Sequence, residues 1–319
     1  MYSKYKEEFI EELQDKDKYI YFTCYDLANA LNKPVNEWAD EDLDTLLASM
    51  ESISANSIRK YIAVFREIQE YLGKKVNVQY QRFQPTKPVF EYISFQKLRS
   101  RILTYDDCIR IRTLLTHIDK GKEYNFRDKV MFELAWEGLS NSEIRFLKEA
   151  DIEWIKGINE NDIKAKLRLP DNREMIIDDE VVVKDLIAAV NERIYARVDK
   201  NGKMLVYPYR FSKYLIKPIA ITNKIKNIDD ESVSNPSLML KQIMSKIILG
   251  QEFISKNAKG GENVLDLENL NLEDIRRSKI IYMLALNKYL SVGDIAKTFG
   301  KSVVCDYYWL KEVSTRVYM

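Results

Sequence analysis

Helical periodicity runs through most of this chain and limits the fold classes open to it. The 319 residues include only 10 glycines and 7 prolines, so few positions interrupt a helix. The strongest amphipathic run opens at residue 54 and continues to Leu72, after which Gly73 is expected to end the helix. Its apolar residues recur every three or four positions and form one stripe, consisting of Ile58, Ile62, Phe65, Ile68, Tyr71 and Leu72. The pattern predicts a protein that is mainly α-helical.

One stretch in the second half of the chain has the period of a β-strand instead. From residue 163 to residue 169, apolar residues alternate with Lys164, Lys166 and Arg168. Residues 170–173 then turn the chain into the apolar segment 174–177, and this hairpin can form a three-stranded sheet with residues 151–154. After Asp179 the periodicity is helical again, apart from a polar loop over residues 223–235, and Asn235-Pro236 is a good helix start. The predicted fold class is therefore mainly α with a small antiparallel β-sheet.

Two domains and a linker are expected from the spacing of these patterns. A chain of 319 residues is long enough for two separate cores. Residues 74–101 lack helical periodicity and include Pro85 and Pro88, so we interpret them as a linker whose aromatic residues dock. Residues 1–73 then form a small helical domain. Residues 102–319 form a larger one, which opens where Thr104 and Asp107 have the spacing of a capping box.

Composition excludes several classes of protein. No apolar run approaches the roughly 20 residues that span a bilayer, and the amino terminus lacks the apolar segment of a signal peptide. Three scattered cysteines indicate reduced thiols. The single histidine, His117, excludes a His-rich metal site and is expected on the surface of a helix over residues 109–117. We therefore expect a cytoplasmic protein with no metal, no cofactor and no membrane partner.

The charges balance overall but are unevenly distributed. A net charge of +1 argues against a protein that coats nucleic acid indiscriminately. Residues 1–50 are acidic, whereas residues 59–101 carry an excess of lysine and arginine. Such segregation can place one basic face on a neutral protein, and a solvated helix surface is the alternative explanation.

The segment from Gly138 to Ile144 has two interpretations. Ser140 and Glu143 have the Ser-x-x-Glu spacing of a capping box, directly after a glycine that can end a helix. The same segment resembles the first conserved box of the tyrosine recombinases, the phage integrase family. That box reads Gly, apolar, Arg, two variable residues, Glu and apolar. Ser140 stands where the family places an arginine on the scissile phosphate.

Two later segments extend this resemblance. Residues 272–278 resemble the family's His-x-x-Arg box, with Glu273 in place of the histidine and Arg276 on the arginine. Residues 295–302 resemble its apolar-Gly-His segment, with Lys301 in place of the last histidine. Tyr307 or Tyr308, slightly early in spacing, would represent the family's nucleophilic tyrosine. Its sheet lysine would be represented by Lys164, Lys166 or Arg168.

The resemblance implies a two-domain fold, in which a helical core-binding domain precedes an integrase-like catalytic-type domain, but it does not imply strand cleavage. A tyrosine that attacks a phosphodiester needs two guanidinium groups on the phosphate oxygens and a general acid for the leaving hydroxyl. Ser140 cannot supply a guanidinium group, and Glu273 adds negative charge beside the phosphate. Because the loss of one such group typically lowers the rate about 10²–10³-fold, we predict that the chain is not an enzyme.

The partner implied by the resemblance is double-stranded DNA, held in a clamp between the two domains. The chain is most similar to integrase-like repressors of temperate phages, which implies a transcriptional repressor that maintains lysogeny by occupying phage operators on the nucleoid. The predicted DNA-binding residues are Arg59, Lys60, Arg66, Arg168, Arg173, Lys241, Arg276, Arg277, Lys297 and Lys301. The chain ends soon after Leu310, which leaves little tail to exchange between protomers and favours a monomer. A regulatory protein is a further candidate partner.

Three other interpretations stay open. Residues 292–304 also fit a helix-turn-helix, in which Ser302 caps a recognition helix and Lys301 or Asp306 faces the groove. An active recombinase with a rearranged site could use Tyr307 or Tyr308 as its nucleophile. An accessory protein could instead bind a true recombinase through the acidic amino-terminal helices and contact DNA little.

Overall fold

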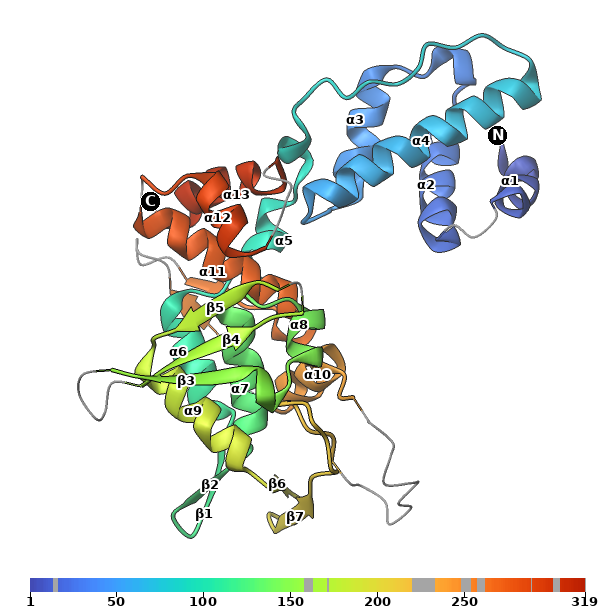
Figure 1. Cartoon of the computed structure of the whole chain (residues 1–319). Coiled ribbons are helices and arrows are strands. Elements are labelled where there is room, and N and C mark those ends of the chain that lie inside the picture. Colours follow the sequence, from blue (N-terminus) through green and yellow to red (C-terminus); the bar gives the residue numbers. More distant parts are fainter. Residues whose placement is uncertain are drawn as a thin grey trace. The chain divides into compact units, whose positions relative to one another are not determined.

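The computed structural model describes residues 1–13, 17–157, 163–170, 172–219, 233–247, 254–256, 262–287, 289–300 and 305–318. The chain divides into two compact units, Met1–Arg99 and Ser100–Met319 (Figure 1). Each unit encloses an apolar core of its own. The mainly helical fold class with small antiparallel sheets is confirmed.

The first unit is built around one long helix. Its helices are α1 (Lys6–Glu12), α2 (Lys18–Ala30), α3 (Asp40–Ser49), α4 (Ala55–Val76) and α5 (Phe95–Arg99), with 3₁₀ turns η1 (Ser3–Tyr5), η2 (Val35–Glu37) and η3 (Val89–Tyr92). α4 packs against α2, α3 and η3 and buries the apolar stripe predicted for it, including Ile58, Phe65 and Ile68. Burial of this stripe stabilises the unit because it removes a continuous apolar surface from water.

α4 runs one turn further than its sequence predicted. Gly73 lies inside the helix, which ends at Val76 and is closed by Asn77 in the left-handed region, at a φ of 51°. A Cβ atom on Gly73 would overlap the ring of Tyr80. The glycine therefore lets the chain that follows α4 cross back close to the helix, and it is not a stop signal here.

The segment predicted as a linker belongs to the first unit. Phe83 and Tyr92 are buried in its core, and the ring of Phe83 stacks on Trp38 with 5.5 Å between centroids. Gln69 of α4 exchanges two hydrogen bonds with the backbone of this segment. Because these contacts fix residues 77–92 on the helices, the boundary between the units falls after residue 99 and not at the end of α4.

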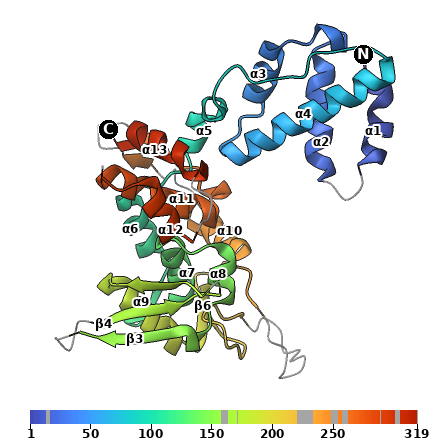
Figure 2. The same cartoon turned by 45° about the horizontal axis from the view of Figure 1, so that its top comes forward.

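The second unit surrounds a buried central helix. Its helices are α6 (Tyr105–Leu114), α7 (Phe126–Trp136), α8 (Asn141–Phe146), α9 (Glu180–Asn191), α10 (Pro236–Ile247), α11 (Leu272–Leu286), α12 (Val292–Thr298) and α13 (Cys305–Tyr318), with 3₁₀ turns η4 (Glu149–Asp151) and η5 (Leu267–Asn269). α7 contacts α8, α9, α10 and α11 (Figure 2). The predicted helix starts after Thr104, at Phe126 and after Asn235 are confirmed. Among the described residues, none of the helices combines the length and apolar character needed to cross a bilayer.

The predicted three-stranded sheet is confirmed. Strands β3 (Ile152–Lys156), β4 (Ile163–Arg168) and β5 (Glu174–Ile177) pair antiparallel in the order β3-β4-β5. One face of the sheet lies against α9 and buries Ala165, Leu167 and Ile177 (Figure 1). Because side chains alternate along a strand, the basic residues of β4 lie on the opposite face.

Three further hairpins were not predicted. They are β1 (His117–Asp119) with β2 (Lys122–Tyr124), β6 (Ile194–Val198) with β7 (Met204–Pro208), and β8 (Ile254–Lys256) with β9 (Glu262–Val264). His117 therefore begins a strand instead of lying on a helix, because α6 ends at Leu114. The prediction that only helices and a loop follow Asp179 is also wrong, since Gly202, at a φ of 77°, turns β6 into β7. Most of the predicted polar loop lies outside the described residues.

Candidate anion-binding pocket of the second unit

An open pocket in the second unit is lined by segments that lie far apart in the sequence. Its volume is about 290 Å³, and its described lining residues are Ser140, Ser142, Glu143, Phe146, Pro170, Arg276, Phe299 and Gly300. Three of the contributing segments, at 140–146, at 276 and at 299–300, are those that resemble the recombinase boxes, and the fourth is the start of the β4–β5 turn. We call this site the three-segment pocket.

The first wall of the pocket is the beginning of α8. Ser140 is the N-cap of this helix: its Oγ accepts from the N–H of Glu143 at 3.4 Å, and the Glu143 carboxylate accepts from the N–H of Ser140 at 2.6 Å. The predicted capping box is therefore confirmed. The Oγ of Ser140 also lies 3.2 Å from the Oγ of Ser142, and both serines line this wall of the pocket.

The second wall carries a buried arginine. Arg276 lies in α11, whose first turn is fixed by a capping box on Asn271, and it is only 2% exposed. Its Nη2 donates to the carbonyl oxygen of Phe299 at 2.5 Å, and its Nη1 lies 3.6 Å from a carboxylate oxygen of Glu273. The Nε atom, which is itself buried, has no hydrogen-bond partner among the described residues. The charge of a guanidinium group on a pocket wall favours an anion there, although the Nε atom itself is buried.

The third wall joins the other two. The ring of Phe299 lies against Gly138, where an added Cβ atom would overlap it, and the guanidinium carbon of Arg276 is 5.5 Å from the ring centroid. Gly138 has a φ of 105°, a conformation that favours glycine. Close packing of the first and third segments therefore depends on the absence of a side chain at Gly138.

Arg173 ties two of these walls together. This residue precedes β5, and its guanidinium group forms an ion pair with Glu143 and donates to the carbonyl oxygen of Thr298 at 2.7 Å. Burial alone would raise the pKa of Glu143, but the hydrogen bonds from Ser140 and Arg173 outweigh it and hold that pKa below its ordinary value. Glu143 is therefore a carboxylate at neutral pH.

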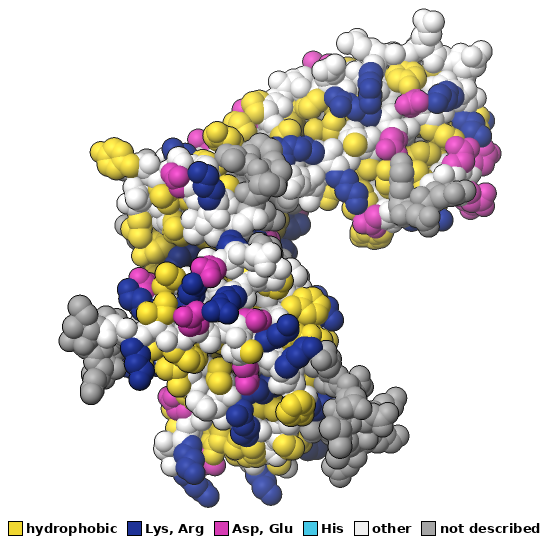
Figure 3. Space-filling view, viewed as in Figure 1, with side chains coloured by type: hydrophobic (Ala, Val, Ile, Leu, Met, Phe, Trp, Pro, Cys, Tyr) yellow, Lys and Arg dark blue, Asp and Glu magenta, His cyan; other side chains and the backbone are white. Residues whose placement is uncertain are grey.

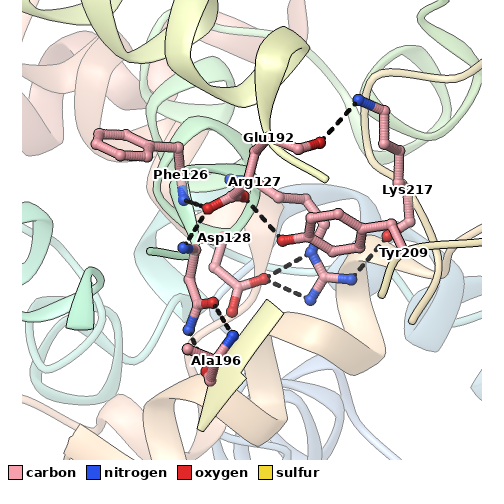
Figure 4. Close-up of polar contacts among 8 residues, drawn as sticks. Phe126, Arg127, Asp128, Glu192, Ala196, Tyr209 and Lys217 are labelled. Atoms are coloured by element: carbon pink, nitrogen blue, oxygen red, sulfur yellow. Dashed lines mark hydrogen bonds and ion pairs between the residues drawn. The ribbon is translucent and has the colours of Figure 1, made fainter. Parts of the chain in front are cut away.

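A second arginine of this unit is buried without lining the three-segment pocket. Arg127, in the first turn of α7, donates to Asp128 from Nε at 2.9 Å and from Nη2 at 2.6 Å, and from Nη1 to the carbonyl oxygen of Lys217 at 2.7 Å (Figure 4). Its guanidinium carbon lies 4.8 and 5.3 Å from the centroids of two tyrosine rings. This arginine is held within the protein by several partners.

The predicted DNA-binding residues of the first unit lie on α4. Arg59 and Lys60 are exposed there, and they contact Asn56 at 2.6 Å and Asp17 at 3.4 Å, respectively. Arg66 is half-buried, and its Nε donates to the carbonyl oxygen of residue 83 at 2.8 Å. Arg59 and Lys60 therefore keep their charges at the surface, whereas Arg66 also holds the segment that follows the helix.

In the second unit most of the predicted basic residues have acidic partners. Arg168 on the outer face of the sheet pairs with Glu153 at 2.8 Å, and Figure 3 shows basic and acidic side chains interspersed over this region. Arg277 pairs with Asp274 at 2.8 Å and lies over the ring of Trp309. Lys241 and Lys297 are exposed. Of the predicted DNA-contacting residues that the structure describes, only Arg276 lines the three-segment pocket.

The remaining family positions are described only in part. Lys301 and Ser302 lie outside the described residues, so the helix-turn-helix interpretation stays a prediction between α12 and α13. For Tyr307 the structure describes the backbone within α13 and not the side chain. Tyr308 is exposed, and no tyrosine is found among the described residues that line the pocket.

Phe299 and Gly300 contribute to the pocket in ways that their sequence did not indicate. The apolar-Gly pair was noted only as part of a motif, yet Phe299 supplies both the carbonyl partner and the ring against which Arg276 packs. In the sequence, an apolar residue directly before a glycine resembles an ordinary helix end. In the structure Gly300 has a φ of 67°, as a glycine after a helix often does. Within the described residues, no group of three or more acidic, histidine or cysteine side chains is placed to hold a metal ion.

Comparison with known proteins returns matches among solved structures alone: no family model matches the chain, and no curated protein matches it. The chain is similar to the Tn1549 transposon integrase in complex with circular intermediate DNA, at 11% identity over 99% of this chain and 94% of that chain, with a TM-score of 0.48. It is also similar to the XerH site-specific recombinase bound to a palindromic difH substrate, at 11% identity over 95% and 74% of the two chains, with a TM-score of 0.42. Similarity at this level carries no functional assignment.

Proposed function

We propose that the protein binds double-stranded DNA with sequence specificity, using a tyrosine-recombinase-like two-domain architecture, and that it represses transcription without cutting the strands. The observation that carries this proposal is the convergence of three separate segments on one pocket. Each of these segments resembles a recombinase box in sequence, and Arg276 lies where they meet. The first segment lies more than 100 residues before the other two in the sequence. We take the meeting of all three at one pocket as a sign that they form one site.

The chemistry of the pocket supports a phosphate as the bound group. The charge of Arg276 and the hydroxyl groups of Ser140 and Ser142, which line the pocket, all suit a phosphate group. Phosphate contacts of this kind position a protein on the duplex and contribute the salt-dependent part of its affinity. Exposed cations such as Arg59, Lys60 and Lys297 would extend the contact along the backbone.

The same pocket argues against strand cleavage. Ser140 supplies a hydroxyl group and no second guanidinium, and Glu273 lies 3.6 Å from Arg276 and offsets part of its charge. Charge that develops on a phosphate in the transition state would therefore meet little stabilisation. A protein that holds the duplex and does not turn over would occupy its site for as long as the complex lasts.

Occupation without turnover is the property that a repressor requires. In its boxes the chain resembles the integrase-like master repressor of the SP-beta group of temperate phages. The proposed role is therefore to maintain lysogeny by covering phage operators, which would place the protein on the DNA of a bacterial cytoplasm.

The first test is a selection of fragmented host and prophage DNA with the purified protein, followed by a cleavage assay on the recovered sequence. We expect a recurring motif, binding that weakens steeply with salt, and no nick or adduct. A nicked suicide substrate would trap a tyrosyl-DNA adduct if cleavage occurred, and loss of that adduct in Tyr307→Phe or Tyr308→Phe would identify the nucleophile.

Two outcomes would replace the proposal. A covalent adduct would make the protein an active recombinase with a rearranged site. Failure to recover any motif, together with retention of a recombinase from the same host on the immobilised protein, would favour an accessory protein.

A further inference from the structure

We propose that Arg173 keeps the three-segment pocket able to accept an anion by neutralising Glu143, and that it does so without touching the anion. The inference rests on the proposed function only in taking the anion to be a DNA phosphate. It replaces the earlier expectation that Arg173 contacts DNA directly, and it assigns Arg173 the role of a positioning residue.

The contacts of Arg173 place its guanidinium group behind the wall of the pocket. It is not among the described lining residues, whereas its ion-pair partner Glu143 and its neighbour Gly300 are. An added Cβ atom on Gly300 would come within 2.8 Å of the Nε atom of Arg173. The Nη1 atom donates to the carbonyl oxygen of Thr298, which fixes the plane of the group. Two directions of the guanidinium fork are therefore occupied within the protein.

Glu143 would oppose an anion if it were left alone. Its carboxylate lines the pocket, and its side chain is 14% exposed, so water screens its charge poorly. The N–H of Ser140 offsets part of that charge through a hydrogen bond of 2.6 Å, but it carries no formal charge. Because the pKa of Glu143 is lowered, its carboxylate stays negatively charged at neutral pH and would repel an anion. Arg173 is the cation that forms an ion pair with it.

Substitutions at the two positions separate this role from a direct contact. Arg173→Ala leaves the Glu143 carboxylate unpaired, and we expect it to weaken anion binding about 10- to 100-fold. Glu143→Gln keeps an oxygen for the N–H of Ser140 and removes the charge, so its binding should match or exceed that of the wild type. The double variant Arg173→Ala/Glu143→Gln should recover to within about threefold of the wild type, because neither charge remains.

Two probes and a matched control complete the experiment. Binding of a mixed-sequence duplex a few helical turns long is followed by fluorescence anisotropy, and binding of inorganic phosphate is followed by the rise it causes in melting temperature. Arg168→Ala and Glu153→Gln, which alter an exposed ion pair at 2.8 Å on the outer face of the sheet, serve as controls and should show no rescue pattern. If Arg173→Ala does not fold, Arg173→Gln provides the same charge change with an amide that can still bond Thr298.

The outcomes distinguish the two proposals. Recovery in the double variant supports charge compensation by Arg173. A double variant as weak as Arg173→Ala overturns it, because a direct contact or a purely structural role would not be rescued by removing Glu143. Wild-type binding by Arg173→Ala also overturns it. If the rescue pattern is seen with phosphate while the wild type fails to bind the duplex, the role of Arg173 stands and the DNA-binding function fails.

Discussion

Two arginines in the second unit are almost equally buried but differ sharply in their partners. Arg127 is 4% exposed and Arg276 is 2% exposed. Arg127 has a carboxylate at 2.6 Å and a carbonyl oxygen at 2.7 Å (Figure 4). The rings of Tyr195 and Tyr209 also lie next to its guanidinium group. Arg276 has one carbonyl oxygen at 2.5 Å and a carboxylate only at 3.6 Å. Burial alone therefore does not tell what a buried arginine does.

The two sites differ in how many of the guanidinium donors have partners within the fold. Burial alone would lower the pKa of Arg127, but Asp128 and the neighbouring tyrosines outweigh it, so the charged form is secured within the fold. Arg276 lines an open pocket, and its buried Nε atom has no partner among the described residues. The predictions below test whether this contrast governs stability and binding, beginning with the largest expected effect.

Arg127→Ala should destabilise the second unit by about 3–5 kcal/mol, because it leaves Asp128 buried without its cation. Arg276→Ala should reduce stability by only about 1–2 kcal/mol, since the main loss is one hydrogen bond to Phe299. Urea unfolding of both variants, followed by far-ultraviolet circular dichroism, measures the two values. Equal losses would contradict the distinction between the sites.

A third cluster of buried charges predicts a dependence of stability on pH. Burial, with the nearby Asp185, raises the pKa of Glu133 in α7 to about 9, although Arg112 lies 2.7 Å away. Because the folded state binds this proton more tightly than the unfolded state, the stabilising contribution is complete below the ordinary value of 4.5. It is lost progressively as the pH rises towards 9.

Glu133→Gln removes this titration, and the pH profile of unfolding free energy should become flatter between pH 5 and 9, by roughly 2 kcal/mol across the range. Thermal or urea unfolding at several pH values tests the expectation. A variant with the same slope as the wild type would show that Arg112 keeps Glu133 ionised.

Gly138 tests whether the packing of Arg276 depends on a glycine. Gly138→Ala forces a side chain into the ring of Phe299 at a φ of 105°, and we expect a loss of about 3 kcal/mol. Gly202→Ala is the matched control: it has a φ of 77° and open space around it, so it should lose only about 1 kcal/mol. The difference between the two isolates the contact with Phe299, and similar losses would mean that Phe299 moves aside freely.

Local signals in the sequence predicted more of this molecule than long-range ones. The capping boxes at Thr104 and Ser140 and the alternation along β4 depend on residues a few positions apart, and all three are found in the structure. The length of α4 was missed because Gly73 lies inside the helix against the ring of Tyr80, and Asn77 closes the helix instead. The hairpin of β6 and β7 was missed because its runs are short and its turn rests on a single glycine.

In the candidate site, too, local features were predicted and long-range contacts were not. The sequence identified Ser140 and Arg276 as positions of interest, but the burial of Arg276 and its bond to Phe299 join residues 23 apart through folding. The pairing of Arg173 with Glu143 spans 30 residues and leaves no periodic signal. Residue types could therefore be predicted, and their partners could not.

The smallest effect in free energy is expected in the affinity for DNA. If Arg276 contacts one phosphate, Arg276→Ala should weaken binding about tenfold for every sequence and lower the slope of log K against log salt by about 0.9. Arg127→Lys, which keeps a positive charge beside Asp128, should leave that slope unchanged if the variant folds. Anisotropy titrations of matched specific and mixed-sequence duplexes over a range of salt concentrations measure both quantities. A changed base preference with an unaltered salt slope would show that Arg276 contacts a base. The contrast with Arg127 would then rest on base recognition and not on a phosphate contact.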